Sequence, residues 1–168
     1  MSRYALAVLF AVSALFGAGG AQVASAQEII RAEIPAIHDW STLRIALTRT
    51  GCLGACPEYR VTISGNGTVD FEGQAFVASP GHHHAQISPG QVRELMAAFA
   101  RAGFFTLQDF YFGPVMDRPG CILSVAFDGR TKSVMDVAGG LVSMPERVRR
   151  LESEIDLIAG TAQWVQPR

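Results

Sequence analysis

The sequence has no hydrophobic run long enough to cross a membrane. Its apolar stretch Tyr4–Phe16 is about 13 residues long, whereas a transmembrane helix needs roughly 20 apolar residues. The stretch follows the positive start Met1-Ser2-Arg3 and precedes Ala24-Ser25-Ala26, the small-residue pattern of a signal-peptide cleavage site. We therefore predict a signal peptide over residues 1–26, cleaved after Ala26, and export to the periplasm or the medium. An uncleaved anchor is the alternative interpretation.

The chain also lacks a cysteine just after this stretch and lacks a marked excess of charge. Without that cysteine no lipid anchor is expected, so we predict no stable membrane anchoring after cleavage. The formal net charge is −1, and it becomes about −2 when Arg3 leaves with the signal. This balance excludes the basic surface of a nucleic-acid-binding domain. The roughly 140 residues that remain make one domain, whose ligand, partners and oligomeric state stay open.

Catalytic motifs are absent as well. Gly-x-Ser-x-Gly does not occur, and Gly65-Asn66-Gly67 does not extend to Gly-x-Gly-x-x-Gly because Asp70 stands at the third glycine position. Asp109, Asp117 and Asp136 are scattered, and turn or surface positions explain each of them. No nucleophile, base and acid can be grouped, so we expect a non-enzymatic domain. A hydrolase is the enzymatic alternative, and no residue supports it.

The pattern of apolar and polar residues along the sequence predicts an α+β fold. Alternating apolar and polar residues predict strands at 43–49, 59–64, 68–72, 121–127 and 132–137. Two amphipathic helices are predicted, one from the capping sequence Ser88-Pro89-Gly90-Gln91 to Gly103 and one from Pro145 to Gly160. Short turns between strands imply an antiparallel β-sheet of about five strands, with both helices packed on one face.

Finer predictions follow from the same patterns. Gly65-Asn66-Gly67 is a hairpin loop, and pairing apolar with apolar residues places Ile63 opposite Val69 and requires a left-handed Gly67. Phe104-Phe105-Thr106-Leu107 is expected to be an extended connector. The charged residues of the second helix are expected to form its solvated face: Glu146, Arg147, Arg149, Arg150, Glu152 and Glu154.

Cysteines are few, and two of the three lie in one loop, Gly51-Cys52-Leu53-Gly54-Ala55-Cys56-Pro57. Glycines allow this loop to bend enough for a bond, and export supplies an oxidising compartment, so we predict a disulfide between Cys52 and Cys56. Cys121 lies in an apolar strand pattern and is predicted to be a buried, inert free thiol. Its pairing with a loop cysteine stays open.

The alternative interpretation of the loop is metal binding or thiol redox chemistry. Cys-x-x-x-Cys-Pro also occurs in thioredoxin-like copper chaperones, and copper or zinc suits thiolate and imidazole ligands. His82 and His84, in a predicted Pro80-Gly81 loop, are the candidate partners of Cys52 and Cys56. The thioredoxin context requires a helix after the motif, whereas a strand is predicted there. We therefore expect a solvated histidine loop and no cofactor, with copper or zinc only under this alternative.

Taken together, these landmarks resemble a bacterial family, domain of unknown function 6438. The most specific part is Thr50 to Tyr59 with its two cysteines, followed by Val61-Thr62-Ile63 and Gly67-Thr68-Val69. Further matches are Ile87-Ser88-Pro89, Asp117-Arg118-Pro119 and Asp128-Gly129-Arg130. The resemblance implies a compact exported or envelope-associated domain, and it brings no activity and no catalytic residue. We thus divide the chain into a signal peptide (1–26), a lead-in segment (27–42) and a single α+β domain (43–165), exported and stapled by the loop disulfide.

Overall fold

The computed structural model describes residues 36–112, 118–137 and 144–166. The predicted signal peptide, its cleavage site and residues 27–35 of the lead-in segment lie outside the described residues, as does Asp117. Within the described ranges no helix is long and apolar enough to cross a membrane. The elements in chain order are η1 (Trp40–Thr42), β1 (Arg44–Arg49), β2 (Glu58–Ser64), β3 (Thr68–Ala75), β4 (Gly81–Gln86), α2 (Pro89–Arg101), η2 (Phe104–Thr106), β5 (Phe110–Phe112), β6 (Cys121–Phe127), β7 (Arg130–Val137), α3 (Glu146–Ala159) and α4 (Ala162–Val165).

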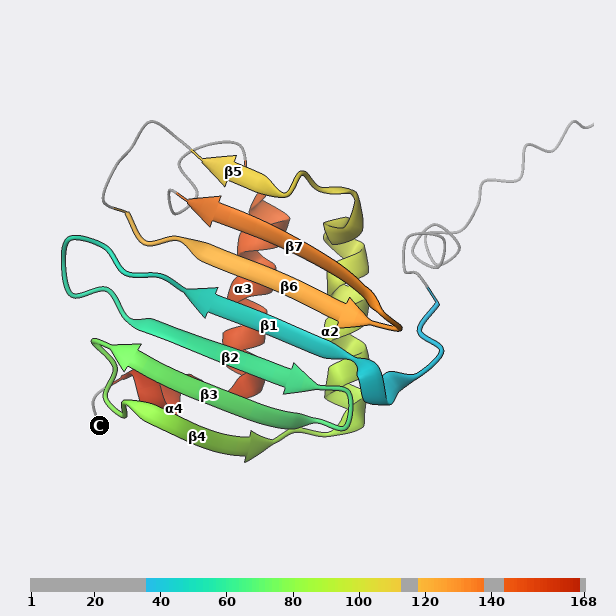
Figure 1. The fold of residues 1–168 in the computed structure, drawn as a ribbon, viewed down its shortest axis with the longest axis horizontal. Coiled ribbons are helices and arrows are strands. Elements are labelled where there is room, and N and C mark those ends of the chain that lie inside the picture. Colours follow the sequence, from blue (N-terminus) through green and yellow to red (C-terminus); the bar gives the residue numbers. More distant parts are fainter. Residues whose placement is uncertain (1–35, 113–117, 138–143, 167–168) are drawn as a thin grey trace, which may run out of the picture.

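The architecture is α+β. In the described part of the chain, seven strands form one sheet in the order β4-β3-β2-β1-β6-β7-β5. Helices α2 and α3 lie side by side behind it, and they contact each other (Figure 1). Every neighbouring pair of strands is antiparallel except β5 and β7, which are parallel. The expectation of about five strands, all antiparallel, is therefore corrected: β4 and β5 are the two strands that the sequence did not predict.

Both unpredicted strands lie at the edges of the sheet. β4 contains the three histidines, so the predicted histidine loop is wrong; Phe71 pairs there with His83, and Glu72 pairs with His82. Its side chains are mostly polar and exposed, which hides the usual strand pattern. β5 has only three residues and pairs through Phe110 with Met135 of β7. A sequence pattern of that length carries too little information to indicate a strand.

The first hairpin has the predicted register. Ile63 is opposite Val69 and Val61 is opposite Phe71. Gly67 has φ +88°, in the left-handed region, and a Cβ atom there would lie 2.1 Å from the carbonyl oxygen of Ile87. Because both the conformation and the space require glycine, this residue fixes the loop and the register together.

The ends of α2 and α3 also lie where the capping residues of the sequence predicted them. Ser88 and Gln91 form a capping box with Pro89 in the first turn of α2, and Gly103 is left-handed just after that helix. Gly160 is the left-handed C-cap of α3. The segment after α2 differs from its prediction, because Phe104–Thr106 forms a 3-10 helix instead of an extended connector. That turn buries Phe104 edge-on against Phe99, at a ring-centroid distance of 4.8 Å.

Two long-range contacts close the domain. β1 is central and pairs with β2 on one side and with β6 on the other. The segment α4 is tied to the connection between β3 and β4, since the backbone N–H of Ser79 donates to the carbonyl of Trp164 at 2.9 Å. The Trp164 ring also stacks on His83, with ring centroids 5.9 Å apart.

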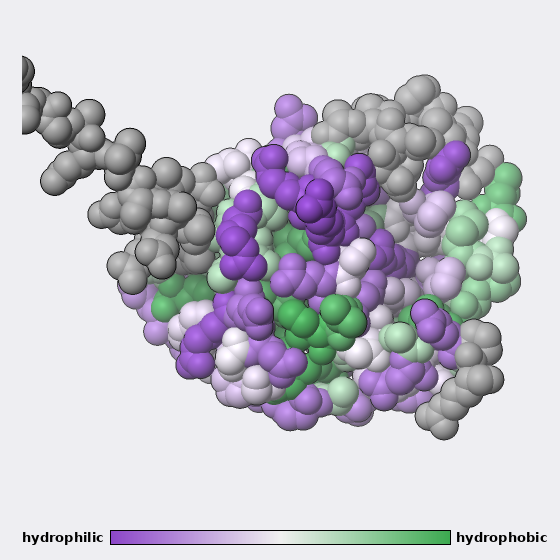
Figure 2. Space-filling view, turned by 180° about the vertical axis from the view of Figure 1, so that it is seen from behind, coloured by the Kyte–Doolittle hydropathy of each residue, from purple (hydrophilic) through white to green (hydrophobic). Residues whose placement is uncertain are grey.

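The core fills the space between the sheet and the helices. Alternate strand residues point into it, such as Ile45 and Leu47 of β1 and Leu123 and Val125 of β6, and all four are buried. The helix side of the molecule is largely hydrophilic at its surface (Figure 2). The buried face of the sheet is apolar along most of its length, and buried charged groups begin where β1 ends at Arg49.

Candidate functional site

The loop between β1 and β2 carries the predicted disulfide. Cys52 and Cys56 are bonded, with their Cα atoms 5.7 Å apart. The backbone N–H of Gly54 also donates to the sulfur of Cys52, at 3.3 Å. Leu53, at the tip, is 83% exposed, and hydrophobic side chains gather at this end of the molecule in Figure 2. The bond closes the loop into a small, rigid ring at the edge of the domain.

The structure does not bring the proposed metal ligands together. The sulfurs of Cys52 and Cys56 are bonded to each other and are not thiolates. The ring of His84 is hydrogen-bonded to Asp70 on the exposed face of β4 and β3, with 2.7 Å between Nδ1 and Oδ1. Among the residues that the structure describes, no three or more His, Cys, Asp or Glu side chains are placed to hold a metal ion.

A pocket of about 430 Å³ opens beside the disulfide loop. Its walls come from the ends of β1, β2, β6 and β7, from one side of α3 and from Val165 of α4, so the folded topology assembles them. The lining combines apolar groups near the loop with buried polar groups below: Arg49, Cys56, Pro57, Tyr59, Pro119, Gly120, Cys121, Asp136, Arg149, Glu152, Ser153 and Val165. None of these residues except the cysteines was predicted as a site residue.

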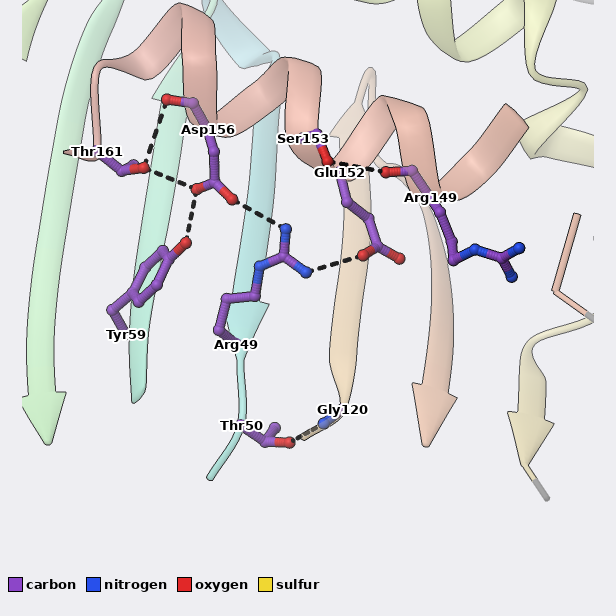
Figure 3. A network of polar contacts seen from close by, with 9 residues as sticks. All are labelled: Arg49, Thr50, Tyr59, Gly120, Arg149, Glu152, Ser153, Asp156 and Thr161. Atoms are coloured by element: carbon purple, nitrogen blue, oxygen red, sulfur yellow. Dashed lines mark hydrogen bonds and ion pairs between the residues drawn. The ribbon is translucent and has the colours of Figure 1, made fainter. Parts of the chain in front are cut away.

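Arg49 is the central polar group of the pocket. Its guanidinium bridges two carboxylates of α3, at 2.9 Å from Glu152 Oε2 and 2.9 Å from Asp156 Oδ2 (Figure 3). Burial alone would lower the pKa of Arg49, but the surrounding acidic groups, Cys121 first and then Asp156, outweigh burial and raise it. The arginine is therefore a permanent cation that joins β1 to α3.

Asp156 is fully engaged by its neighbours. The hydroxyl of Tyr59 donates to Oδ1 at 2.8 Å and that of Thr161 donates to the same oxygen at 2.9 Å, while Oδ2 accepts from Arg49 (Figure 3). Burial, and then the negative charge of Asp156, raises the pKa of Tyr59. The tyrosine thus stays protonated and serves as a donor.

Cys121 is the free cysteine, and it is buried. It pairs with Arg49 in the sheet register, so its side chain lies on the inner face beside the cluster. Burial, and then the charge of Glu152, raises the pKa of its thiol. A thiol that stays protonated is a poor nucleophile and a poor metal ligand.

Glu152 and Asp136 are the acidic groups of the pocket floor. They are 6% and 3% exposed, respectively. Burial raises the pKa of Glu152; Arg49 offsets this in part, and the charge of Asp136 adds to the rise. Oε1 of Glu152 has no hydrogen-bond partner within the described residues. A hydrogen bond from the Cys121 thiol, a weak donor, lowers the pKa of this carboxyl group and only partly offsets the effect of burial.

The backbone between the strands supports this floor. Where β1 ends and β6 begins, the N–H of Gly120 donates to Thr50 Oγ1 at 2.9 Å and the N–H of Thr50 donates to the carbonyl of Gly120 at 3.0 Å (Figure 3). On α3 the hydroxyl of Ser153 donates to the carbonyl of Arg149, at 3.3 Å. These bonds keep the two sides of the pocket in fixed positions.

The sequence predictions missed most of this site. Glu152 was predicted on the solvated face of α3 and Asp136 at a surface or turn position, and both are buried. The feature of the sequence that could have identified these buried charges is the periodicity of the neighbouring apolar residues. Arg49 follows Ile45 and Leu47 at period two, and Glu152 and Asp156 follow Val148 at steps of four, so all three charges belong to inward-facing positions.

Comparison with known proteins tests the resemblance. No curated protein matches this chain. The model of the family described as "Domain of unknown function (DUF6438)" matches residues 43–159. That range contains the disulfide loop, Cys121 and every pocket residue except Val165. The chain therefore belongs to the DUF6438 family, as its cysteine loop and turn sequences predicted.

Proposed function

We propose that the protein is an exported, non-enzymatic binding domain, and that its ligand enters the pocket beside the Cys52–Cys56 loop. The observation that carries this proposal is Glu152, a buried carboxyl group with one unsatisfied oxygen at the floor of an open pocket. Leaving such an atom without a partner costs about 1–3 kcal/mol. Buried polar groups without partners are rare in folded proteins, and a ligand would supply the missing hydrogen bond.

The chemistry of the pocket supports binding more than catalysis. Its tyrosine and its thiol both have raised pKa values and stay protonated. Arg49 is held between two carboxylates. The Cys121 thiol lies beside the Glu152 carboxyl group, but burial raises the pKa of both groups, so the thiol is held protonated and not as the activated nucleophile of covalent catalysis. The groups are fixed in position, as a selective binding site requires.

The disulfide supports both the export and the pocket. Cys56 and Pro57 line the wall, so the bond that closes the loop also shapes the entrance. Disulfides persist in oxidising compartments outside the cytosol, which agrees with the signal peptide predicted at residues 1–26. In this proposal the loop is a structural clamp, and binding requires no metal or other cofactor.

The test is a fragment titration followed by NMR. Isotope-labelled protein recovered after export is titrated with a set of small neutral, cationic and anionic aromatic fragments. We expect at least one fragment to shift the amide signals of Gly120, Cys121 and Ser153, which line the pocket. Signals of Thr131 and Ser133, which line a separate surface hollow, serve as the control. Fragments that shift the control signals and leave the pocket signals unchanged would overturn the proposal.

A further inference from the structure

Two basic and two acidic side chains line the pocket, and ion pairs connect them to further charged groups outside it. Arg49 and Arg149 bring positive charge to its lining, against the carboxyl groups of Asp136 and Glu152. Each arginine is shared with a further carboxylate outside the lining, Arg49 with Asp156 and Arg149 with Glu146. Glu146 also pairs with Arg150, so the connected group contains four acidic side chains (Asp136, Glu146, Glu152 and Asp156) and three arginines. A pocket of that composition attracts cations.

Hydrogen bonding narrows the choice of acceptor. Both oxygens of Asp156 are occupied, Oδ1 by Tyr59 and Thr161 and Oδ2 by Arg49. Oε2 of Glu152 accepts from Arg49, whereas its Oε1 accepts from no described residue. The ligand group that satisfies Oε1 has to be a hydrogen-bond donor. Because this oxygen belongs to an acid, a charged donor forms the stronger bond.

The rest of the lining sets the shape of the ligand. Apolar walls above the polar floor of the pocket come from Pro57, Pro119, Val165 and the disulfide-bonded Cys56. A volume of about 430 Å³ lies at the small end of the range for ligand pockets, roughly 300–1,000 Å³. These walls accommodate a short apolar body attached to the donor.

We propose that the pocket binds small organic amines, with the protonated amine donating to Oε1 of Glu152 and the apolar part packed against the proline and disulfide wall. This inference rests on the proposed function and adds the ligand class. It assigns Glu152 as the residue that selects for positive charge and Arg49 as the residue that positions it. Asp156, with Tyr59 and Thr161, holds Arg49 in place.

The experiment compares three probes of similar size by NMR titration: 2-phenylethylamine, 2-phenylethanol and phenylacetate. We expect the amine to shift the signals of Gly120, Cys121 and Ser153, the alcohol to bind at least tenfold more weakly, and phenylacetate to leave these signals unchanged. Glu152→Gln keeps the shape of the side chain and removes its charge, so it should weaken amine binding at least tenfold without changing alcohol binding. Glu154→Gln, on the same helix but outside the lining, is the matched control and should bind like the unmodified protein.

The outcomes separate this inference from the proposed function. If the alcohol or phenylacetate binds in the pocket as tightly as the amine, the pocket is a ligand site and the amine assignment is wrong. Undiminished amine binding by Glu152→Gln would refute the role of Glu152. If none of the probes and none of the broader fragments shifts the pocket signals, water alone occupies the site and both proposals fall. Should Glu152→Gln not fold, the comparison of the three probes on the unmodified protein still decides the ligand class.

Discussion

At the scale of single residues, the buried charges depend on one arginine. The guanidinium group of Arg49 forms ion pairs with both Glu152 and Asp156. Its side chain is mostly buried, and so are both carboxylates. A buried ion pair adds little net stability when it is complete, but removing one partner leaves an uncompensated charge in a low-dielectric environment. The stability of the domain should therefore respond strongly to substitution of this residue.

Arg49→Met should lower the free energy of unfolding by about 3–5 kcal/mol at neutral pH, measured by urea denaturation. Glu152 already has a raised pKa in the folded state, and loss of the arginine raises it further. The folded state then holds its proton more tightly than the unfolded state, so stability is retained at low pH and lost as the pH rises through the folded-state pKa. The difference in the free energy of unfolding between the unmodified protein and Arg49→Met should accordingly shrink as the pH is lowered towards the ordinary glutamate pKa of about 4.3. Arg60→Met, at an exposed position of β2, is the control, and an equal loss in both variants would contradict the argument.

The cysteines give a second prediction at this scale. Cys52 and Cys56 are bonded and Cys121 is buried, with a raised thiol pKa. Thiol titration of exported protein at neutral pH should therefore detect almost no thiol before denaturation and one thiol per chain after it. Finding two or three thiols would contradict the disulfide and would support the metal or redox alternative, which equilibration with copper(I) or zinc would then test.

At the scale of elements, two left-handed turn glycines, Gly67 and Gly129, differ in the space around them. Gly67 combines a left-handed conformation with a carbonyl oxygen of Ile87 where a Cβ would lie. Gly129 is also left-handed, at φ +72°, but open space surrounds it. The two positions separate the cost of backbone strain from the cost of a steric clash.

Gly67→Val should lower stability by more than about 1–3 kcal/mol, the usual cost of a strained backbone conformation, because the clash with Ile87 is added to it. Gly129→Val should show the strain alone and lose less. The measurement is the midpoint of chemical denaturation for each variant. An unchanged midpoint for Gly67→Val, or an equal loss in both variants, would mean that the loop tolerates a side chain.

The elements also show what the sequence could predict. Strands with alternating core residues, the hairpin register and the helix caps were predicted because local patterns specify them. β4 was missed because its residues are polar on an exposed edge, and β5 was missed because pairing with distant β7 defines it. The pocket was missed for a related reason. Arg49, Asp136 and Glu152 come from three separate elements, and only the sheet order together with the packing of α3 places them in one site.

At the scale of the whole molecule, the folded domain and the predicted export signal are separate parts of the sequence. The first described residues already contact the domain, since the backbone N–H groups of His38 and Asp39 donate to the carboxylate of Asp128 at 2.7 and 3.0 Å. Asp128 lies in the turn between β6 and β7, so these two hydrogen bonds hold His38 and Asp39 against that turn. A cut after Ala26 leaves this attachment intact.

We predict that cleavage of the signal peptide during export leaves a mature protein that begins at Gln27. The reason is the small-residue site Ala24-Ser25-Ala26 after a short apolar stretch. The measurement is N-terminal sequencing of protein recovered from the periplasm or the medium. Replacing Ala26 by a bulky residue should block cleavage at this position and serves as the control. Recovery of the intact Met1 form from membranes would contradict the prediction and would support an uncleaved anchor.

The central place of β1 in the sheet has a consequence for the order of synthesis and folding. Arg49 pairs with Tyr59 on one side, but its partner on the other side is Cys121, which is synthesised much later. The connection between β3 and β4 similarly gains its backbone contacts only when Trp164 and Val165 have been made. Long-range pairings of this kind form slowly. The inner strand of the sheet therefore cannot be completed on both sides until most of the chain has been synthesised.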